Sequence, residues 1–336
     1  MIPTAYQGRP ARRPSYRLTL AGQVISPELE GRLMRLRLTD RRGLEADQLD
    51  ITLADHDGRL ALPRHGAELT LALGWAEQGL VERGTFIVDE VEHAGAPDAL
   101  TIRARSADMR QRLPGKRSQS WHELTLADIV TTIAGRHGLE PAIGATLQGV
   151  YLEHIDQTDE SDLHFLTRLA EQFDAIATIK AGNLLFMPAG QAATASGQPI
   201  PPVTLSRNVG DSHRYVEADR EAFTGVLAYW HDPDAAERAE VIAGSDENLK
   251  RLRHTYATRD DAVTAAKSEW QRLQRGGAEC SLTLAEGRPD LYPETPVRLQ
   301  GFKAEIDARP WLITEVTHEL TDTAYTGGIT LEIQGS

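Results

Sequence analysis

The sequence predicts a mainly β protein with an α+β insert: two similar tube-like β-barrels in one chain, plus a small α/β domain. Two observations lead to this prediction. The same series of strand-like segments occurs twice, roughly 230 residues apart, and the segment between the copies changes from alternating to helical periodicity. A length of 336 residues is sufficient for two or three domains, each with its own core.

The repeat consists of five short segments that occur in the same order in both copies. The first copy contains Asp50–Asp55, Leu62–Pro63, Glu68–Leu71, Phe86–His93 and Leu100–Ile102. The second contains Ser281–Glu286, Tyr292–Pro293, Val297–Leu299, Trp311–His318 and Gly328–Leu331. The offset is 231 residues from Thr52 to Thr283, 225 from Glu90 to Glu315 and 229 from Thr101 to Thr330. Differences of this size fit loop insertions and deletions after a duplication.

Two short strands are expected before the first copy, at Ser15–Val24 and Arg32–Leu38, because apolar and polar residues alternate there. After the strand at Asp50–Asp55, the sequence Asp-His-Asp-Gly predicts a turn ending at Gly58. A calcium loop is rejected, since aligning Gly58 with the glycine of such a loop places Leu53 and Arg64 at positions that require carboxylates.

Two helices and a hairpin are predicted in the insert. Thr125 and Asp128 can form a capping box for the first helix, whose apolar face contains Leu126, Ile129, Val130 and Ile133. Thr158 or Ser161 begins the second helix, with Asp159, Glu160 and Asp162 near its positive end. Residues 175–180 and 184–187 then form the hairpin, closed by Pro188.

The region after the insert predicts a connector, two strands and a third helix. Residues 189–202 are rich in Ala, Gly, Ser, Gln and Pro, which is typical of a linker or exposed loop. Strands at 214–218 and 225–230 precede a polar loop, and Thr258 with Asp261 caps a helix that Gly276 ends. The predicted domains are a first barrel at 1–112, the α/β insert at 113–188, the linker at 189–202 and a second barrel with a helix at 203–336; the barrels are allowed to exchange strands.

Charge and composition narrow the functional classes. A net charge of -13 and a pI near 5.3 argue against specific nucleic-acid binding, which requires a basic face. Nine arginines nevertheless lie within the first 42 residues, and we predict an interface for an acidic partner at Arg9, Arg12, Arg13 and Arg17. The alternative is that the arginines cover the solvent face of two edge strands.

Other features predict the cellular setting. The single cysteine, Cys280, excludes an internal disulfide framework and fits a core position in a protein from a reducing cytoplasm. No apolar run approaches the ~20 residues of a membrane span, so no membrane insertion by this chain is expected. Arg12 and Arg13 could suggest a twin-arginine signal, but a strand-like pattern follows them in place of an apolar signal core.

The residues suggest no catalytic, cofactor or metal site. The eleven histidines show no spacing that places two ligands on one helix face. His93 and His318 occupy equivalent positions in the repeat, which favours a shared structural hydrogen bond. The sequence from Gly115 to Ser118 matches a phosphate-binding loop only by chance, because Arg110 stands where that loop needs glycine. A carboxylate pair for glycoside hydrolysis is left open by composition but has no support.

The chain resembles the late control protein D family, the baseplate hub proteins of contractile phage tails and of R-type tailocins. The resemblance spans nearly the whole chain, and its most specific stretch is Gln157–Glu171. This stretch is similar to a Glu-Ser-Asp helix that the family shares with the N-terminal half of type VI secretion spike proteins. The resemblance implies two tube-like barrels per subunit and a homotrimer.

The resemblance also implies a structural function. Three subunits with two barrels each would join a hexameric tail tube to a trimeric spike, as a symmetry adaptor. The implied partners are a spike protein, a tail tube or tube-initiator protein, a tape-measure protein and other baseplate proteins. We expect assembly in the bacterial cytoplasm and a place in a virion or tailocin baseplate. A spike component of a type VI-like apparatus is the alternative, and a carboxylate-based cell-wall hydrolase is a weaker one.

Overall fold

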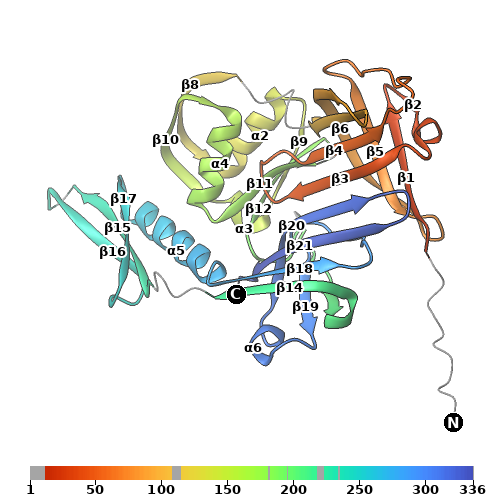
Figure 1. The fold of residues 1–336 in the computed structure, drawn as a ribbon. Helices are drawn as coiled ribbons and strands as arrows, with labels where there is room; N and C mark the ends of the chain where they lie inside the picture. Colours follow the sequence, from red (N-terminus) through yellow and green to blue (C-terminus); the bar gives the residue numbers. More distant parts are fainter. Residues whose placement is uncertain are drawn as a thin grey trace, which may run out of the picture.

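The computed structural model describes residues 12–107, 115–180, 182–194, 196–217, 223–233 and 235–335. The described chain is mainly β, and thirteen of its strands form one sheet that runs through both barrel regions (Figure 1). Four separate hydrophobic cores lie in the first barrel region, the insert, the second barrel region and an outlying unit formed by residues 225–275. No helix among the described residues is both long enough and apolar enough to cross a membrane.

The first barrel region follows the expected alternation of apolar and polar residues. Its strands are β1 (Pro14–Leu20), β2 (Gln23–Val24), β3 (Leu33–Arg41), β4 (Gln48–Ala54), β5 (Glu68–Trp75), β6 (Gly79–Ala94) and β7 (Ala99–Ser106), with a short 3-10 helix η1 (Ser26–Leu29). In β4 the buried residues are Leu49, Ile51 and Leu53, so every second side chain enters the core. The predicted turn after β4 is present, and Gly58 closes it with a positive φ of 62°.

The second barrel region is built from strands on either side of the outlying unit. It contains β13 (Val203–Ser206), β14 (Gly210–Glu217), β18 (Ala278–Leu284), β19 (Pro296–Gln300), β20 (Trp311–Leu320) and β21 (Tyr325–Ile333), with the short helices η2 (Arg207–Val209) and α6 (Ala304–Asp307). Trp311 is fully buried in this core, and its indole N–H donates to the carbonyl of Ile306 at 2.9 Å.

The predicted equivalence of the two repeats is confirmed by strand pairing. The first copy pairs in the order β4-β7-β6-β5, and the second pairs in the order β18-β21-β20-β19. A register shift follows Val88 in β6 and recurs after Ile313 in β20, at the same offset of 225 residues (313 minus 88). A bulge that occurs at the same position twice indicates that the copies share one strand design.

The offset predicted for the last strand is wrong by two residues. In the structure Glu92 pairs with Thr101, and its counterpart Thr317 pairs with Gly328, so the offset is 227 (328 minus 101). Thr330 lies two residues further along. A shift of two leaves every side chain on its original face, and the alternating pattern alone could therefore not detect it.

The insert contains both predicted helices and the predicted hairpin. Its elements are β8 (Lys116–Thr125), α2 (Leu126–Arg136), β9 (Glu140–Ile143), α3 (Ala145–Gln148), β10 (Tyr151–Ser161), α4 (Asp162–Gln172), β11 (Ala175–Lys180) and β12 (Asn183–Pro188). Thr125 and Asp128 form the capping box of α2. Ser161 caps α4, so the placement of Asp159 and Glu160 at that helix end is wrong: both belong to β10, which pairs with β8 in a long ribbon.

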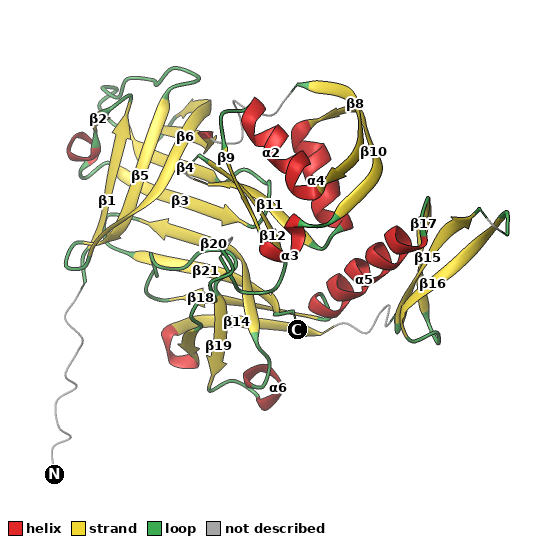
Figure 2. Ribbon diagram, turned by 180° about the vertical axis from the view of Figure 1, so that it is seen from behind, coloured by secondary structure: helices red, strands yellow, loops and turns green. Residues whose placement is uncertain are grey.

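The polar loop predicted after residue 230 is wrong. That region forms β16 (Glu237–Gly244) and β17 (Leu249–Tyr256), which flank β15 (Gly225–Asp232) in a three-stranded sheet. Helix α5 (Arg259–Arg275), capped by Thr258 as predicted, packs on this sheet, and the unit projects away from the barrels (Figures 1 and 2). Only Val241 and Ala243 are buried in β16, so the strand carries too few apolar residues to show a strand pattern.

Gly287, in the loop after β18, provides a test of packing between the barrels. A Cβ at this position would lie 2.2 Å from the ring of Tyr325, which is 1% exposed and cannot move aside. We predict that Gly287→Ala lowers the free energy of unfolding by about 1–3 kcal/mol through overpacking. Gly149→Ala is the control, because a Cβ added there would meet nothing within 4 Å. Urea denaturation of both variants checks this, and equal stability would contradict the close packing of Tyr325 on this loop.

Candidate functional site: the junction between the barrels

The two barrel regions meet through backbone pairing of β3 with β20. The pairs run antiparallel from Arg41 with Glu315 to Leu36 with Leu320. Leu320 and Tyr325 come from the second repeat, yet both pack in the hydrophobic core of the first barrel region. The two regions therefore share strand pairing and core, and rotation between them would break both.

A set of buried aromatic and polar groups closes one side of the junction. The indole N–H of Trp75 donates to the carbonyl of Gly287 at 3.0 Å, and the ring centroids of Trp75 and Tyr325 are 5.1 Å apart. The hydroxyl of Tyr325 lies 2.9 Å from Nδ1 of His318. Burial, together with the charge of Arg83, lowers the pKa of His318 well below its usual value, so this histidine is neutral.

Arg83 anchors the loop after β18 to the first barrel region. Its side chain is 1% exposed and donates to the carbonyls of Pro289 at 2.7 Å and Leu291 at 3.2 Å. The guanidinium also lies over the ring of Tyr292, 4.2 Å from its centroid. These contacts immobilise the loop mainly through its carbonyls and one aromatic ring.

Ion pairs follow the junction on its other side. Arg35 pairs with Glu319 at 2.9 Å and Arg41 with Glu315 at 3.0 Å, both at partly exposed positions. Exposed pairs of this kind contribute only about 0–1 kcal/mol each. These ion pairs favour one register of β3 against β20 more than they stabilise the junction. A shift of one strand along the other would separate the arginines from their carboxylates.

A second group of ion pairs, around Arg42, lies buried between the two barrel regions. Nε of Arg42 lies 2.9 Å from Glu294, and Nη2 lies 2.5 Å from Glu332. Burial raises the pKa of Glu294 to about 7; Arg42 acts against this shift, and Glu332 adds to it. Burial also raises the pKa of Asp40 to about 6, assisted by Asp47.

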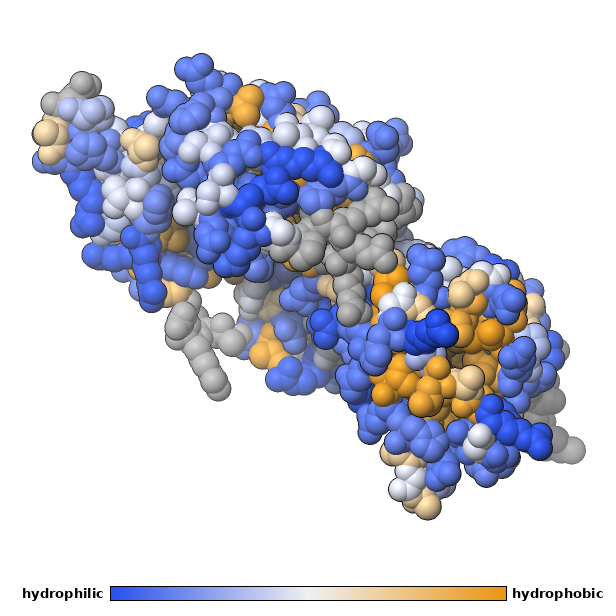
Figure 3. Space-filling model, turned by 90° about the horizontal axis from the view of Figure 1, so that it is seen from above, coloured by the Kyte–Doolittle hydropathy of each residue, from blue (hydrophilic) through white to orange (hydrophobic). Residues whose placement is uncertain are grey.

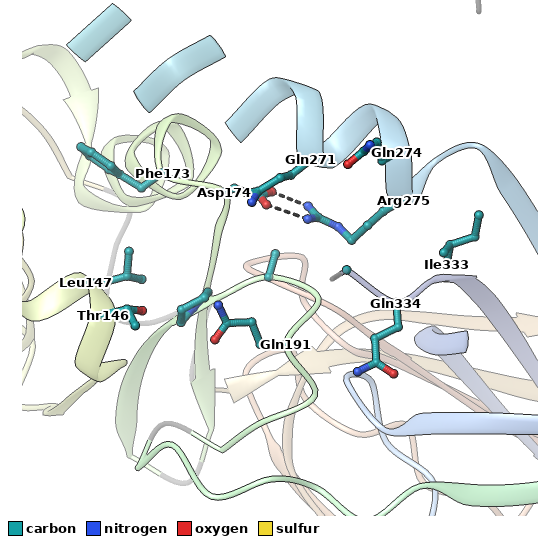
Figure 4. Close-up of a pocket in the computed structure, with 13 residues that line it drawn as sticks. Thr146, Leu147, Phe173, Asp174, Gln191, Gln271, Gln274, Arg275, Ile333 and Gln334 are labelled. Atoms are coloured by element: carbon teal, nitrogen blue, oxygen red, sulfur yellow. Dashed lines mark hydrogen bonds and ion pairs between the residues drawn. The ribbon is translucent and has the colours of Figure 1, made fainter. Parts of the chain in front are cut away.

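The insert is attached to the junction by further charges. Nζ of Lys180 lies 3.1 Å from Asp40 and 2.6 Å from Asp47, which are residues of the first barrel region. Arg275 at the end of α5 makes a two-pronged ion pair with Asp174, at the rim of a cleft of about 400 Å³ (Figure 4). Asp40 lies on the same face of β3 as the buried residues Leu36 and Leu38. A charged residue on an otherwise apolar strand face is the sequence signal that could have located the cluster of Lys180 with Asp40 and Asp47.

Of the arginines in the predicted interface, Arg12 and Arg13 directly precede β1 and Arg17 lies within it. Arg9 falls outside the described residues. Arg12 lies 3.4 Å from Glu286, the backbone N–H of Arg13 donates to Glu77, and Arg17 forms an ion pair with Glu82. Arg13 and Arg17 are exposed. Their role toward another protein stays a prediction.

The equivalent histidines are both hydrogen-bonded side chains. His93 lies 3.2 Å from Asp55, and His318 contacts Tyr325 as described above. Cys280 is fully buried, and burial raises the pKa of its thiol to about 11, as expected for a core residue. In the parts of the chain that the structure describes, no group of three or more potential metal ligands is found.

Exposed apolar residues mark one end of the first barrel region. Val24, Met34 and Leu62 are 53%, 50% and 60% exposed, and they lie in β2, at the start of β3 and in the loop between β4 and β5. Figure 3 shows hydrophobic residues gathered on the lobe at right, which corresponds to this region.

The raised carboxyl pKa values predict a pH dependence of stability. Glu294 has an ordinary pKa of 4.5 and a value of about 7 in the folded chain. Between these values the folded state holds more protons than the unfolded state, so the free energy of unfolding decreases as pH rises through this window. Glu294→Gln should reduce this decrease, by about 1.4 kcal/mol for each pKa unit removed. Urea denaturation at several pH values checks it, with Glu315→Gln as a partly exposed control from the same junction.

The comparisons with known proteins agree with this architecture. Residues 42–324 match the family model described as phage tail baseplate hub. The probable baseplate hub proteins of Escherichia phages 186 and P2 are each 45% identical to this chain, over 96% of it and 93% of their own length.

Solved structures share the fold at low sequence identity. A 43 kDa tail protein of prophage MuSo2 from Shewanella oneidensis has a TM-score of 0.68 at 17% identity, covering 95% of this chain and 98% of that protein. A tail protein from Neisseria meningitidis also scores 0.68, at 13% identity and 96% coverage of both chains. An Escherichia coli protein described as a component of the type VI secretion system scores 0.57 at 15% identity, covering 91% of this chain and 74% of its own. With duplicated barrel strands, a shared junction and these matches, the chain belongs to the phage tail baseplate hub family.

Proposed function

We propose that this baseplate hub protein adapts a hexameric tail tube to a trimeric central spike. The observation that carries the proposal is the identical pairing order of the two repeats, held in one sheet by β3 and β20. A homotrimer of such chains presents six similar barrels in a ring, with sixfold-like contacts on one side and threefold contacts on the other. The rigid junction supports this role, since a ring of barrels needs a fixed angle between each pair.

The proposed partners follow from the surfaces available. The apolar end of the first barrel region, with Val24, Met34 and Leu62, suits a tube, tube-initiator or spike protein, because such a patch is stabilised by burial. The acidic bulk of the chain suits a channel that a tape-measure protein or DNA passes without adhering. Assembly in the bacterial cytoplasm and incorporation into a virion or tailocin baseplate complete the proposal, together with contacts to other baseplate proteins.

A structural, non-enzymatic role is part of the same proposal. The carboxylates with raised pKa values, Asp40 and Glu294, lie in the ion-pair clusters that join the parts of the chain. Their task there is to hold the junction, and we expect no hydrolysis of peptidoglycan. A spike component of a type VI-like apparatus is the second candidate, supported by the shared fold of the Escherichia coli protein.

We also propose domain boundaries at 1–112, 113–188, 189–202 and 203–336, with strands shared between the barrels. The separate core made by Val226, Ala228, Val241, Ala262 and neighbouring residues supports a further unit within the last of these. Its helix α5 connects it to the ion pair at Asp174 and so to the insert.

The adaptor proposal predicts a trimer in solution. Light scattering of the purified chain, alone and with its spike protein, should give three copies of a 36.9 kDa chain. A stable monomer or a true hexamer under both conditions would remove the adaptor mechanism.

The arginine proposal is tested separately. Arg12→Glu combined with Arg13→Glu should weaken assembly of tube or spike onto the hub, because the change reverses two charges directly before β1. Arg253→Glu is the control, since this exposed arginine lies in the outlying unit. Unchanged assembly of both components on the double variant would remove the arginine interface.

A further inference from the structure

Two histidines face each other across the β8–β10 ribbon of the insert. His122 and His154 are directly paired residues of the antiparallel strands. Their Nδ1 atoms are 3.0 Å apart, and both side chains are exposed on the outer face of the ribbon. In a structural role alone, one ring would donate an N–H to the other, and the pair would be an ordinary surface hydrogen bond.

A carboxylate holds one of the two rings by its other nitrogen. Oδ2 of Asp156 lies 3.2 Å from Nε2 of His154. An N–H on Nε2 that donates to this carboxylate leaves the Nδ1 of His154 as a lone-pair donor that faces His122.

We propose that His122 and His154 bind a divalent transition-metal ion through their Nδ1 atoms, with Asp156 orienting His154 as an outer carboxylate. Two nitrogens bound at about 2.0–2.1 Å to one ion are about 2.9 Å apart at a right angle and about 3.3 Å apart at the tetrahedral angle. The observed 3.0 Å lies within this interval. Carboxylate, histidine and metal in series is the usual arrangement of a metal-bound imidazole.

The His154 side of the pair is accessible from a cleft. His154 and Asp156 line this cleft of about 880 Å³ between the insert and the outlying unit, whose lining contains the acidic residues Glu171, Asp261 and Glu269 as well as Arg168 and Arg272. Imidazole ligands select ions such as Zn²⁺, Ni²⁺ or Cu²⁺ over Mg²⁺ and Ca²⁺. The two histidines supply two nitrogen donors, and water molecules would complete the coordination sphere. Metal binding at this pair does not depend on the proposed adaptor function.

Equilibrium dialysis of the purified, untagged chain against Zn²⁺ tests the proposal, with bound metal counted by elemental analysis. We expect one Zn²⁺ per chain, displaced by Cu²⁺ but not by Mg²⁺ or Ca²⁺. His122→Ala and His154→Ala should each abolish this binding, and Asp156→Asn should weaken it about 10- to 100-fold. His56→Ala, which changes an exposed histidine on the turn after β4, should leave it unchanged.

A second measurement guards against variants that misfold. Cu²⁺ electron paramagnetic resonance on the unaltered chain should show two equatorial nitrogen donors, and His154→Ala with an unchanged circular dichroism spectrum should lose this signature. No stoichiometric Zn²⁺ binding, binding that survives both alanine substitutions, or binding abolished by His231→Ala or His254→Ala but not by His122→Ala would each overturn the proposal.

Discussion

The architecture depends on the backbone pairing of β3 with β20. Strand edges that remained unpaired would leave N–H and C=O groups exposed at the meeting point of two barrels. Pairing them converts two small sheets into one, and the shared core at Leu320 and Tyr325 makes the arrangement cooperative. The proposed task of this protein is to hold barrels at a fixed angle. Main-chain hydrogen bonds fix that angle, and they depend little on which side chains the strands carry.

The charges around the junction serve specificity more than stability. Arg42 with Glu294 and Glu332 is a buried cluster between the two barrel regions. Lys180, which is partly exposed, pairs with the buried Asp40 and Asp47 where the insert meets the first barrel region. Removing such charges from water costs several kcal/mol per ion, and the mutual attraction offsets that cost only when every partner is in place. A misdocked insert or barrel would leave one of these charges buried alone, so wrong arrangements are disfavoured more strongly than the correct one is favoured.

The sequence predicted what depends on local pattern and missed what depends on pairing between distant strands. Alternation located the barrel strands, and the caps at Thr125 and Thr258 located two helices, because the residues responsible are neighbours in the chain. The ribbon of β8 and β10 was missed, since its outer face carries polar residues that resemble a loop. The His122 and His154 pair was invisible for the same reason: its two members are 32 residues apart, and only strand register brings them together.

A duplication accounts for the common order of the central strands in the two barrel regions. The outermost strands differ, so the two regions are not interchangeable. In the first region β1 extends the sheet antiparallel to β5, whereas in the second β13 extends it parallel to β19. The strand order and the bulge are the same in both regions, and the outermost strands differ. A ring of such chains would offer six similar walls to a sixfold partner, while the alternation of two edge types around the ring retains a threefold identity. Both symmetries can thus be encoded in one polypeptide, because sheet interiors and sheet edges respond to different constraints.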